Sequence, residues 1–299
     1  RIMRNRSTAG NREREDAVCR LSWREGKESL LLTVAVMGTG NIGMRHYNVL
    51  SRIEGVRLVA VPKRVERMKE LAKRGYAVAG SLREAASLGA TMGLIATDTG
   101  WHVEDGLSAV ESGLDVLVEK PLSTDATQAE RLCEKVAEAG RKVFVGCVLR
   151  FSESLNAFRG LLEKIGRVHA VRIECQSYLP DWRPTRSYKE SYSARADEGG
   201  VLLDLIHEID YAGWIFGWPL AVQARVKNLR RLGIQADEAA GLIWETPAGC
   251  AVSARLDYLS RPPRRRMTAC GEWGTLEWDG VRNTVVLSLS DAPSQEMTF

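Results

Sequence analysis

Hydrophobic runs alternate with longer amphipathic segments through the first half of the chain. The runs have the length and β-branched content of buried strands, and they span residues 31–37, 58–61, 92–96, 116–118 and 143–148. The segments between them show helical periodicity, at 41–52, 65–74, 103–112 and 124–139. Strands that alternate with helices form parallel sheets with right-handed crossovers. The pattern predicts an α/β domain with a doubly wound parallel sheet, ending near residue 150.

The pattern changes after residue 150. A helix is predicted at 154–164, a strand at 168–176, a turn-rich loop at 177–198 and a buried helix at 200–216. Six short alternating segments follow, separated by Gly, Pro, Asn or Asp: 222–229, 239–245, 251–258, 265–270, 275–278 and 284–289. Such alternation is typical of antiparallel strands with one covered face. This half is predicted to be an α+β domain with an open, mostly antiparallel sheet.

Composition and charge limit the class of protein. The chain has 299 residues, of which 44% are hydrophobic and 27% charged, so it is expected to form about two ordinary globular domains, at 31–150 and 151–299. Residues 1–30 hold eight Lys or Arg and five Asp or Glu, and we expect a mobile or non-native extension there. The remaining charge is nearly balanced, so no nucleic-acid partner is expected.

The cysteines and the apolar runs bear on the cellular compartment in which the protein is expected. Six cysteines are scattered without disulfide-framework or zinc spacing, which is typical of a reducing compartment, and a cytoplasmic location is the expectation. The longest apolar run, 30–37, is far shorter than the roughly 18 residues of a membrane span. Neither membrane insertion nor secretion is predicted.

A glycine-rich turn follows the first predicted strand. It reads Gly38, Thr39, Gly40, Asn41, Ile42 and Gly43, and it opens a helix. In a dinucleotide site the first glycine makes a tight turn, the second lets a pyrophosphate approach the backbone, and the third lets helix and strand pack closely. A glycine turn without a ligand is the alternative, but the strand before it and the helix after it favour a nucleotide site.

The end of the second predicted strand bears on the choice of cofactor. NAD sites usually place an acid there for the ribose 2′-hydroxyl, whereas this chain has Lys63 and Arg64 and no carboxylate before Glu66. We therefore expect NADP in preference to NAD, the alternative being two solvated residues at a helix start. Thr97, His102, Glu119 and Lys120 stand at or near later strand ends and are further candidate cofactor contacts, although His102 also suits a helix start.

Three residues are candidates for the chemistry. Lys120 follows the fourth predicted strand, at the edge of a parallel sheet where ligands bind. Asp204 and His207 are three residues apart, which places them on one face of the predicted helix. His207 would take a hydroxyl proton, Lys120 would polarise or protonate the same oxygen, and Asp204 would orient the imidazole or stabilise its cation. A solvated lysine and a packing Asp/His pair are the plain alternatives.

A metal site is not expected. Asp204, His207, Glu208 and Asp210 include the right residue types, but helix geometry turns Glu208 and Asp210 away from the first pair.

The glycine turn, the Glu119-Lys120-Pro121 segment and the Gly-Gly-x-Leu-x-Asp-x-x-His helix together resemble the Gfo/Idh/MocA family of oxidoreductases, over residues 31 to about 290. The resemblance implies an NAD(P)-binding Rossmann domain at 31–150 and a substrate-binding domain at 151–299, whose open sheet joins subunits into a dimer or tetramer. It also implies sugar or cyclitol substrates. Lys120 would be the active-site lysine before a cis proline, with Asp204 and His207 completing the site.

Two departures from the family pattern stand out. Many relatives space the aspartate and histidine four residues apart, so which of Asp204 and His207 lies nearer the reacting carbon stays open. Family members usually continue into a C-terminal segment that packs on the first domain, whereas this sequence stops at Phe299, and we expect either a truncated or a divergent end.

The loop before the catalytic helix suggests the substrate. It mixes aromatic and cationic side chains, which suits a polyhydroxylated ring and also a phosphate or carboxylate. The candidate substrate contacts are Lys120, Arg150, Trp182, Arg183, Tyr192, Asp204 and His207. Alternatively, the aromatic residues only pack the loop and the arginines are surface charges.

The leading hypothesis is an NAD(P)-dependent oxidoreductase acting on a CH–OH group of a sugar, amino sugar, nucleotide sugar or cyclitol. A family member that retains its cofactor and uses transient oxidation to hydrolyse or eliminate a glycosidic substituent is a second possibility. A non-catalytic NAD(P)-binding regulator is a third, which the presence of Lys120, Asp204 and His207 disfavours.

Overall fold

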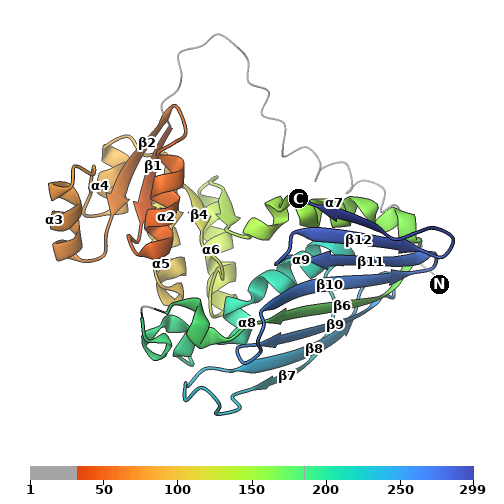
Figure 1. Cartoon of the computed structure of the whole chain (residues 1–299). Helices are drawn as coiled ribbons and strands as arrows, with labels where there is room; N and C mark the ends of the chain where they lie inside the picture. The colour runs from red at the N-terminus through yellow and green to blue at the C-terminus, as the bar shows by residue number, and fades with distance from the viewer. Residues whose placement is uncertain (1–31, 185) are drawn as a thin grey trace, which may run out of the picture. The chain divides into compact units, whose positions relative to one another are not determined.

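A computed structural model describes residues 32–184 and 186–299, which contain two β-sheets (Figure 1). The first has five strands in the order β2-β1-β3-β4-β5, and the second has eight in the order β13-β12-β11-β10-β6-β9-β8-β7. This confirms the predicted fold class, a Rossmann-like parallel sheet followed by an α+β part. The extension expected at residues 1–30 lies outside the described residues.

All neighbouring strands of the first sheet are parallel. The strands are β1 (Leu32–Met37), β2 (Val56–Val61), β3 (Met92–Ile95), β4 (Asp115–Val118) and β5 (Val143–Val145). The helices are α2 (Asn41–Leu50), α3 (Val65–Lys73), α4 (Leu82–Ser87), α5 (His102–Glu111) and α6 (Ala126–Glu138), with a 3₁₀ turn η2 (Thr99–Trp101). Val34 and Val36 enter the core on one face of the sheet, and Ala35 enters the core on the other. Both faces are therefore covered, as a doubly wound sheet requires.

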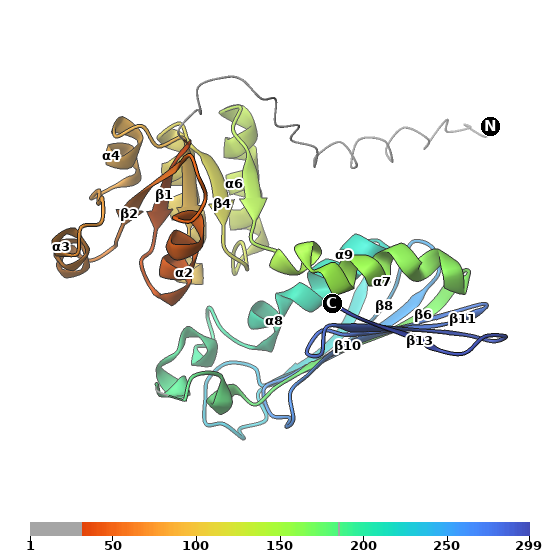
Figure 2. The ribbon, with the colours of Figure 1, turned by 45° about the horizontal axis from the view of Figure 1, so that its top comes forward.

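The eight-stranded sheet is antiparallel except for the pair β6 and β9. Its strands are β6 (Val168–Gln176), β7 (Val222–Lys227), β8 (Ala239–Glu245), β9 (Ala251–Asp257), β10 (Arg264–Gly271), β11 (Gly274–Asp279), β12 (Thr284–Leu289) and β13 (Gln295–Thr298). Helices α7 (Glu153–Leu161), α8 (Val201–Asp204) and α9 (Ile206–Phe216) cover one face (Figure 2). Phe158, Tyr211 and Trp278 are fully buried in the core between these helices and the sheet.

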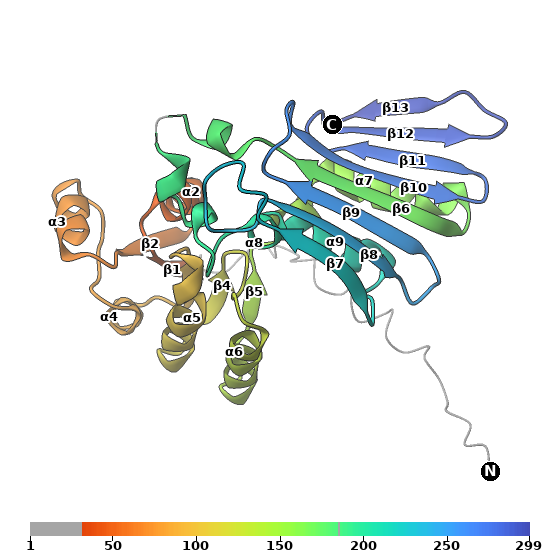
Figure 3. The same ribbon diagram turned by 90° about the horizontal axis from the view of Figure 1, so that it is seen from below.

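The other face of this sheet is open (Figure 3). Along β8, buried residues alternate with exposed ones, and Ile243 is 60% exposed. The surface over β6, β7, β8 and β9 is hollowed, with a volume of about 860 Å³. No helix among the described residues is long and apolar enough to cross a membrane.

Short 3₁₀ segments connect the two sheets and form much of the loop before α8. They are η3 (Val148–Phe151), η4 (Leu162–Ile165), η5 (Leu179–Trp182), η6 (Tyr188–Glu190) and η7 (Tyr192–Ala194).

Three features differ from the sequence prediction. Helix α4 was not predicted, since six residues are too few to show periodicity. Strand β13 was not predicted either, and it is an edge strand with little buried surface. The helix predicted at 200–216 is wrong as a continuous element, because Leu205, at φ −98° and ψ 31°, separates α8 from α9. The break has a direct effect on the candidate site.

Candidate active site

The glycine turn between β1 and α2 has the geometry of a dinucleotide cradle. Gly38 has φ +85°, and a Cβ on it would lie 2.6 Å from the carbonyl oxygen of Ala96. A Cβ on Gly43 would lie 1.8 Å from the carbonyl oxygen of Gly38, so helix and turn pack too closely for any side chain. A Cβ on Gly40 would meet nothing within 4 Å. This side of the turn is open, at a helix N-terminus that favours an anion, and so it fits a pyrophosphate.

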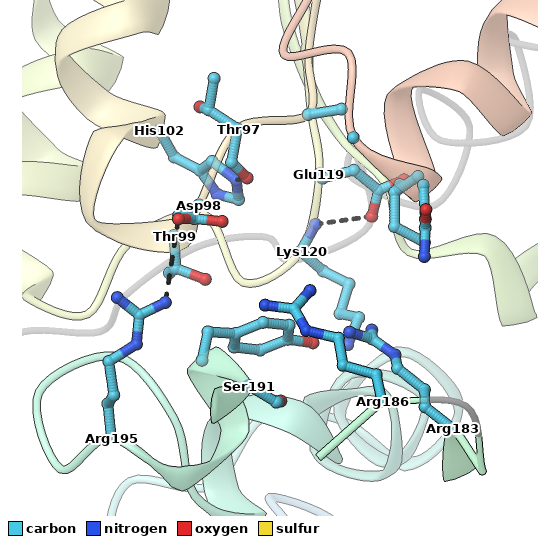
Figure 4. A pocket seen from close by; sticks show the side chains of 15 residues that line it. Thr97, Asp98, Thr99, His102, Glu119, Lys120, Arg183, Arg186, Ser191 and Arg195 are labelled. Atoms are coloured by element: carbon cyan, nitrogen blue, oxygen red, sulfur yellow. Dashed lines mark hydrogen bonds and ion pairs between the residues drawn. The ribbon is translucent and has the colours of Figure 1, made fainter. Parts of the chain in front are cut away.

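A cavity of about 320 Å³ lies beside this turn (Figure 4). Gly40, Asn41 and Ile42 line it from the turn, and Thr97, Asp98, His102, Glu119 and Lys120 line it from segments at or after strand ends. The loop before α8 contributes Arg183, Arg186, Ser191, Tyr192 and Arg195. The cavity therefore brings together most of the predicted cofactor contacts and part of the predicted substrate loop.

The basic residues after β2 lie along a neighbouring cavity of about 450 Å³, together with Gly38, Thr39 and Gly40. Lys63 is engaged within the protein, since its Nζ lies 2.5 Å from Asp105 Oδ1 and 4.6 Å from the centre of the Trp101 ring. Arg64 has no ion pair with another described residue. Arg67, one turn further along α3, donates a hydrogen bond to the Thr39 carbonyl oxygen (3.4 Å) and pairs with Glu70. Arg64 and Arg67 thus both line the cavity beside the glycine turn.

Lys120 reaches from the end of β4 to the second half of the chain. Its Nζ donates a hydrogen bond to the main-chain carbonyl oxygen of Asp204 (2.9 Å). In a continuous helix that oxygen would accept from the amide of Glu208, but the Glu208 amide bonds Leu205 instead (3.3 Å). The break at Leu205 thus leaves the Asp204 carbonyl open to Lys120. The Lys120–Pro121 peptide bond is cis, as the family resemblance implies.

The carboxylate of Asp204 points elsewhere. It accepts a hydrogen bond from the buried Tyr258 hydroxyl (2.5 Å), and it also interacts with the Tyr192 hydroxyl. Burial and this carboxylate raise the pKa values of both tyrosines, so both hydroxyls keep their protons. The Asp204 carboxylate does not orient His207 as expected, because it interacts with the hydroxyls of Tyr258 and Tyr192 instead.

His207 is 9% exposed, and its buried Nδ1 has no hydrogen-bond partner within the described chain. Burial first, and then the nearby Lys120 and Arg265 cations, lower its pKa from 6.5 to about 4. The ring is therefore uncharged at neutral pH.

Glu119 and His46 form a pair that sequence reasoning missed. Glu119 Oε1 lies 2.5 Å from His46 Nε2 of α2, and Glu119 Oε2 accepts a hydrogen bond from the Lys120 amide (3.2 Å; Figure 4). Burial raises the pKa of Glu119, but the contacts with His46 and Lys120 together outweigh it and leave this pKa lowered. The pair ties helix α2 to the backbone that carries Lys120. The sequence holds no local signal for this pair, because His46 and Glu119 are 73 residues apart.

Thr97 and His102 hold the strand ends together. The Thr97 hydroxyl donates to Asp105 (2.8 Å), the carboxylate that also binds Lys63. The ring nitrogens of His102 lie 2.8 Å from the Pro121 carbonyl oxygen and 3.0 Å from that of Thr97. His102 is also the first residue of α5, so it has the helix-start position considered from the sequence.

The predicted substrate residues have different surroundings. Arg150 forms a bidentate ion pair with Asp210, at 2.6 and 2.9 Å, and lines a separate cavity of about 690 Å³ that Lys120 also borders. Trp182 Nε1 donates to Ser177 Oγ (2.9 Å), and its ring packs edge-on against Tyr258. Arg183 and Tyr192 line the cavity beside Lys120. Arg186, which sequence reasoning missed, lies there too, and its three-residue spacing from Arg183 was the available signal.

Comparison with known families accounts for both halves of the chain. Residues 32–147 match a family model described as "Oxidoreductase family, NAD-binding Rossmann fold" (GFO_IDH_MocA), and residues 161–277 match the GFO/IDH/MocA C-terminal domain.

Individual relatives are dehydrogenases by name. Inositol 2-dehydrogenase of Mycolicibacterium gilvum is 28% identical over 197 residues, which are 64% of this chain and 54% of that protein. The chain thus spans about half the length of this relative. Myo-inositol 2-dehydrogenase of Thermotoga maritima is 27% identical over 86% of this chain and 78% of its own length. The crystal structure of WlbA dehydrogenase from Bordetella pertussis with NADH and UDP-GlcNAcA has a TM-score of 0.78 at 21% identity, covering 90% of this chain and 80% of that chain, and shares the fold.

Proposed function

Because the chain belongs to the Gfo/Idh/MocA family of oxidoreductases with an NAD-binding Rossmann fold, we propose that it moves a hydride between NADP(H) or NAD(H) and a CH–OH or keto group of a sugar, amino sugar, nucleotide sugar or cyclitol. The observation that carries the proposal is the hydrogen bond from Lys120 Nζ to the Asp204 carbonyl (2.9 Å). It brings an ammonium group, beside a glycine cradle, to the segment that bears His207.

Lys120 and His207 have the properties that alcohol oxidation requires. The uncharged His207 ring takes the hydroxyl proton, while the Lys120 ammonium donates a hydrogen bond to the same oxygen. Since the pKa of His207 is only about 4, the ring is a weak base. Proton transfer therefore depends on Lys120, whose positive charge makes the substrate hydroxyl more acidic and stabilises the developing negative oxygen.

The nicotinamide ring, when bound, supplies the hydride acceptor in oxidation and the donor in reduction. Gly40 leaves the backbone accessible to the pyrophosphate. In the reduction direction Lys120 polarises the keto group, and the proton returns to its oxygen. Asp204 serves as a positioning residue, because its carbonyl holds Lys120 and its carboxylate holds Tyr258.

NADP is the cofactor we propose in preference to NAD. Arg64 and Arg67 border the cavity beside the glycine turn, and no carboxylate lines that cavity except Asp98. An arginine fork suits a phosphate monoester, whereas an NAD site needs an acceptor for the 2′-hydroxyl.

The open face of the eight-stranded sheet is the surface that we propose joins subunits, in a dimer or tetramer.

Two measurements on Lys120→Ala test the proposal. We expect turnover of a screened sugar or cyclitol to fall by orders of magnitude, because the lysine serves the reacting oxygen. Binding of NADPH, followed by energy transfer from the eight tryptophans, should stay close to that of the unsubstituted protein. Equal turnover in the variant would remove Lys120 from the mechanism, and an unsubstituted protein that binds neither NADPH nor NADH would refute the oxidoreductase function.

A further inference from the structure

Two arginines of the site loop have no carboxylate partner among the described residues. Arg183 lies over the Tyr192 ring, with its guanidinium carbon 6.0 Å from the ring centre. Arg186 donates a long hydrogen bond, 3.5 Å, to the main-chain oxygen of Glu190. Both line the cavity beside Lys120 (Figure 4). Each guanidinium carries five N–H donors. The Tyr192 ring and the Glu190 carbonyl oxygen therefore leave most of these donors available.

Two other arginines near this loop do have carboxylate partners. Arg195 of the same loop pairs with Glu198 at 2.6 Å. Arg261 pairs with Asp181 at 2.9 Å. An arginine that only solubilised this loop could have used the same arrangement, with an acid a few residues away.

The carboxylates that line the cavity are already committed. Glu119 binds His46 and the amide of Lys120. Asp98 lies 3.8 Å from Arg195. Arg195 lines the cavity as well, so four cations, Lys120, Arg183, Arg186 and Arg195, face the two carboxylates Asp98 and Glu119. The cavity therefore has an excess of positive charge at the place where a substrate must meet Lys120.

We infer that the substrate carries an acidic group, a carboxylate or a phosphate, and that Arg183 and Arg186 bind it while Lys120 binds the reacting oxygen. The inference rests on the proposed function and narrows its substrate class from sugars in general to acidic ones. Arginine matches such groups in shape as well as charge, because its fork donates two parallel hydrogen bonds to a pair of oxygens. A neutral sugar would leave two cations facing the cavity without a counter-charge.

The pyrophosphate of the cofactor is a second anion of the kind that arginines bind. Arg186 also lines the cavity beside the glycine turn, so it can reach either anion. Arg183 lines only the cavity with Lys120 and not the other. Substitution of Arg183 therefore distinguishes the two sources: it should affect an acidic substrate and leave the binding of the cofactor unchanged.

Calorimetric titration of the NADH-saturated protein tests the inference, because this complex cannot oxidise an alcohol and binding is measured alone. The probes are D-glucose and myo-inositol, which are neutral, and D-glucuronate and D-glucose 6-phosphate, which are acidic. They are titrated into the unsubstituted protein, Arg183→Gln, Arg186→Gln and the control Arg83→Gln, which removes an exposed arginine of helix α4. Affinity for NADH is measured for each variant first.

We expect at least one acidic probe to bind about tenfold or more tightly than glucose, and Arg183→Gln to remove about tenfold of that affinity. Binding of the neutral probes and of NADH should be unaffected in every variant, and the Arg83→Gln control should behave like the unsubstituted protein. Normal NADH binding with no preference for acidic probes overturns the inference and leaves the proposed function standing. Weaker NADH binding in Arg183→Gln, with an unchanged preference, assigns the arginines to the pyrophosphate and also overturns it. If the protein binds NADPH but not NADH, the same titrations use the NADPH-saturated protein. A protein that binds neither cofactor fails as the proposed oxidoreductase, and the inference fails with it.

Discussion

Two substitutions in the glycine turn, Gly40→Ala and Gly43→Ala, test ligand binding and packing separately. Gly40 has φ −74° and ψ −167°, which an L-residue adopts without strain. A Cβ there meets nothing within 4 Å. Replacing glycine with alanine at a helix N-cap lowers the free energy of unfolding by up to about 1 kcal/mol. The lower conformational entropy of the unfolded chain raises it by about 0.4–1 kcal/mol. The free energy of unfolding should therefore change by less than about 1 kcal/mol.

Gly43→Ala is the matched contrast. Its Cβ would lie 1.8 Å from the Gly38 carbonyl oxygen, where carbon and oxygen normally approach to about 3.3 Å. Helix α2 or the turn must move by roughly 1.5 Å, the difference between these two distances. Overpacking of this kind costs about 3 kcal/mol, so Gly43→Ala should unfold at clearly lower urea concentration.

Urea denaturation followed by circular dichroism measures stability, and tryptophan-to-NADPH energy transfer measures binding. We expect Gly40→Ala to fold like the unsubstituted protein and to bind NADPH at least tenfold more weakly, because the added methyl group occupies the face proposed for the pyrophosphate. Unchanged NADPH affinity in a stable Gly40→Ala protein would refute the assignment of that face. A fully stable Gly43→Ala would refute the packing argument.

The remaining predictions concern the tyrosine contact, pH and cofactor choice. Tyr258→Phe should lower the free energy of unfolding by about 1.5–3 kcal/mol, as measured in urea, because the buried Asp204 carboxylate loses a hydrogen bond. The pKa of His207 is 6.5 when unfolded and about 4 when folded, so only the unfolded chain binds the proton between these values. Stability should be complete above pH 6.5 and decline as the pH falls toward 4, and thermal scans of His207→Gln should lack this part of the decline. Arg64→Ala and Arg67→Ala should each weaken NADPH binding about tenfold and leave NADH binding unchanged, as fluorescence titration would show.

Much of the fold follows from periodicity along the chain. Strands β6, β8 and β12 were predicted to the residue. In β8 buried and exposed positions alternate, and β12 is a short run rich in β-branched residues between polar residues. The glycine turn was also predictable, since Gly38 and Gly43 each have a steric reason and the open backbone at Gly40 suits an anion. Local patterns of this kind need no knowledge of distant contacts.

The site could be predicted only in part, because its side chains meet across long sequence separations. Asp204 and Tyr258 are 54 residues apart, and no local pattern indicates that their side chains share a hydrogen bond. The break at Leu205 was missed for the same reason: the apolar pattern continues through it, and the hydrogen bond from Lys120 that uses the open carbonyl comes from 84 residues away. His46 lay in a predicted helix, but its partner Glu119 is known only from the structure.

The contact between Lys120 and the main chain of residue 204 has a consequence for how this protein can change in evolution. A carbonyl oxygen is present whatever side chain the residue carries, so substitutions at 204 can alter the tyrosine contacts and still leave the lysine held in place. The sensitive position is Leu205, whose backbone conformation keeps that oxygen out of the helix. Leucine is itself a strong helix former, so the break is held by the packing of this buried side chain in the core. A position without chemical function thereby becomes a point of constraint on the reaction.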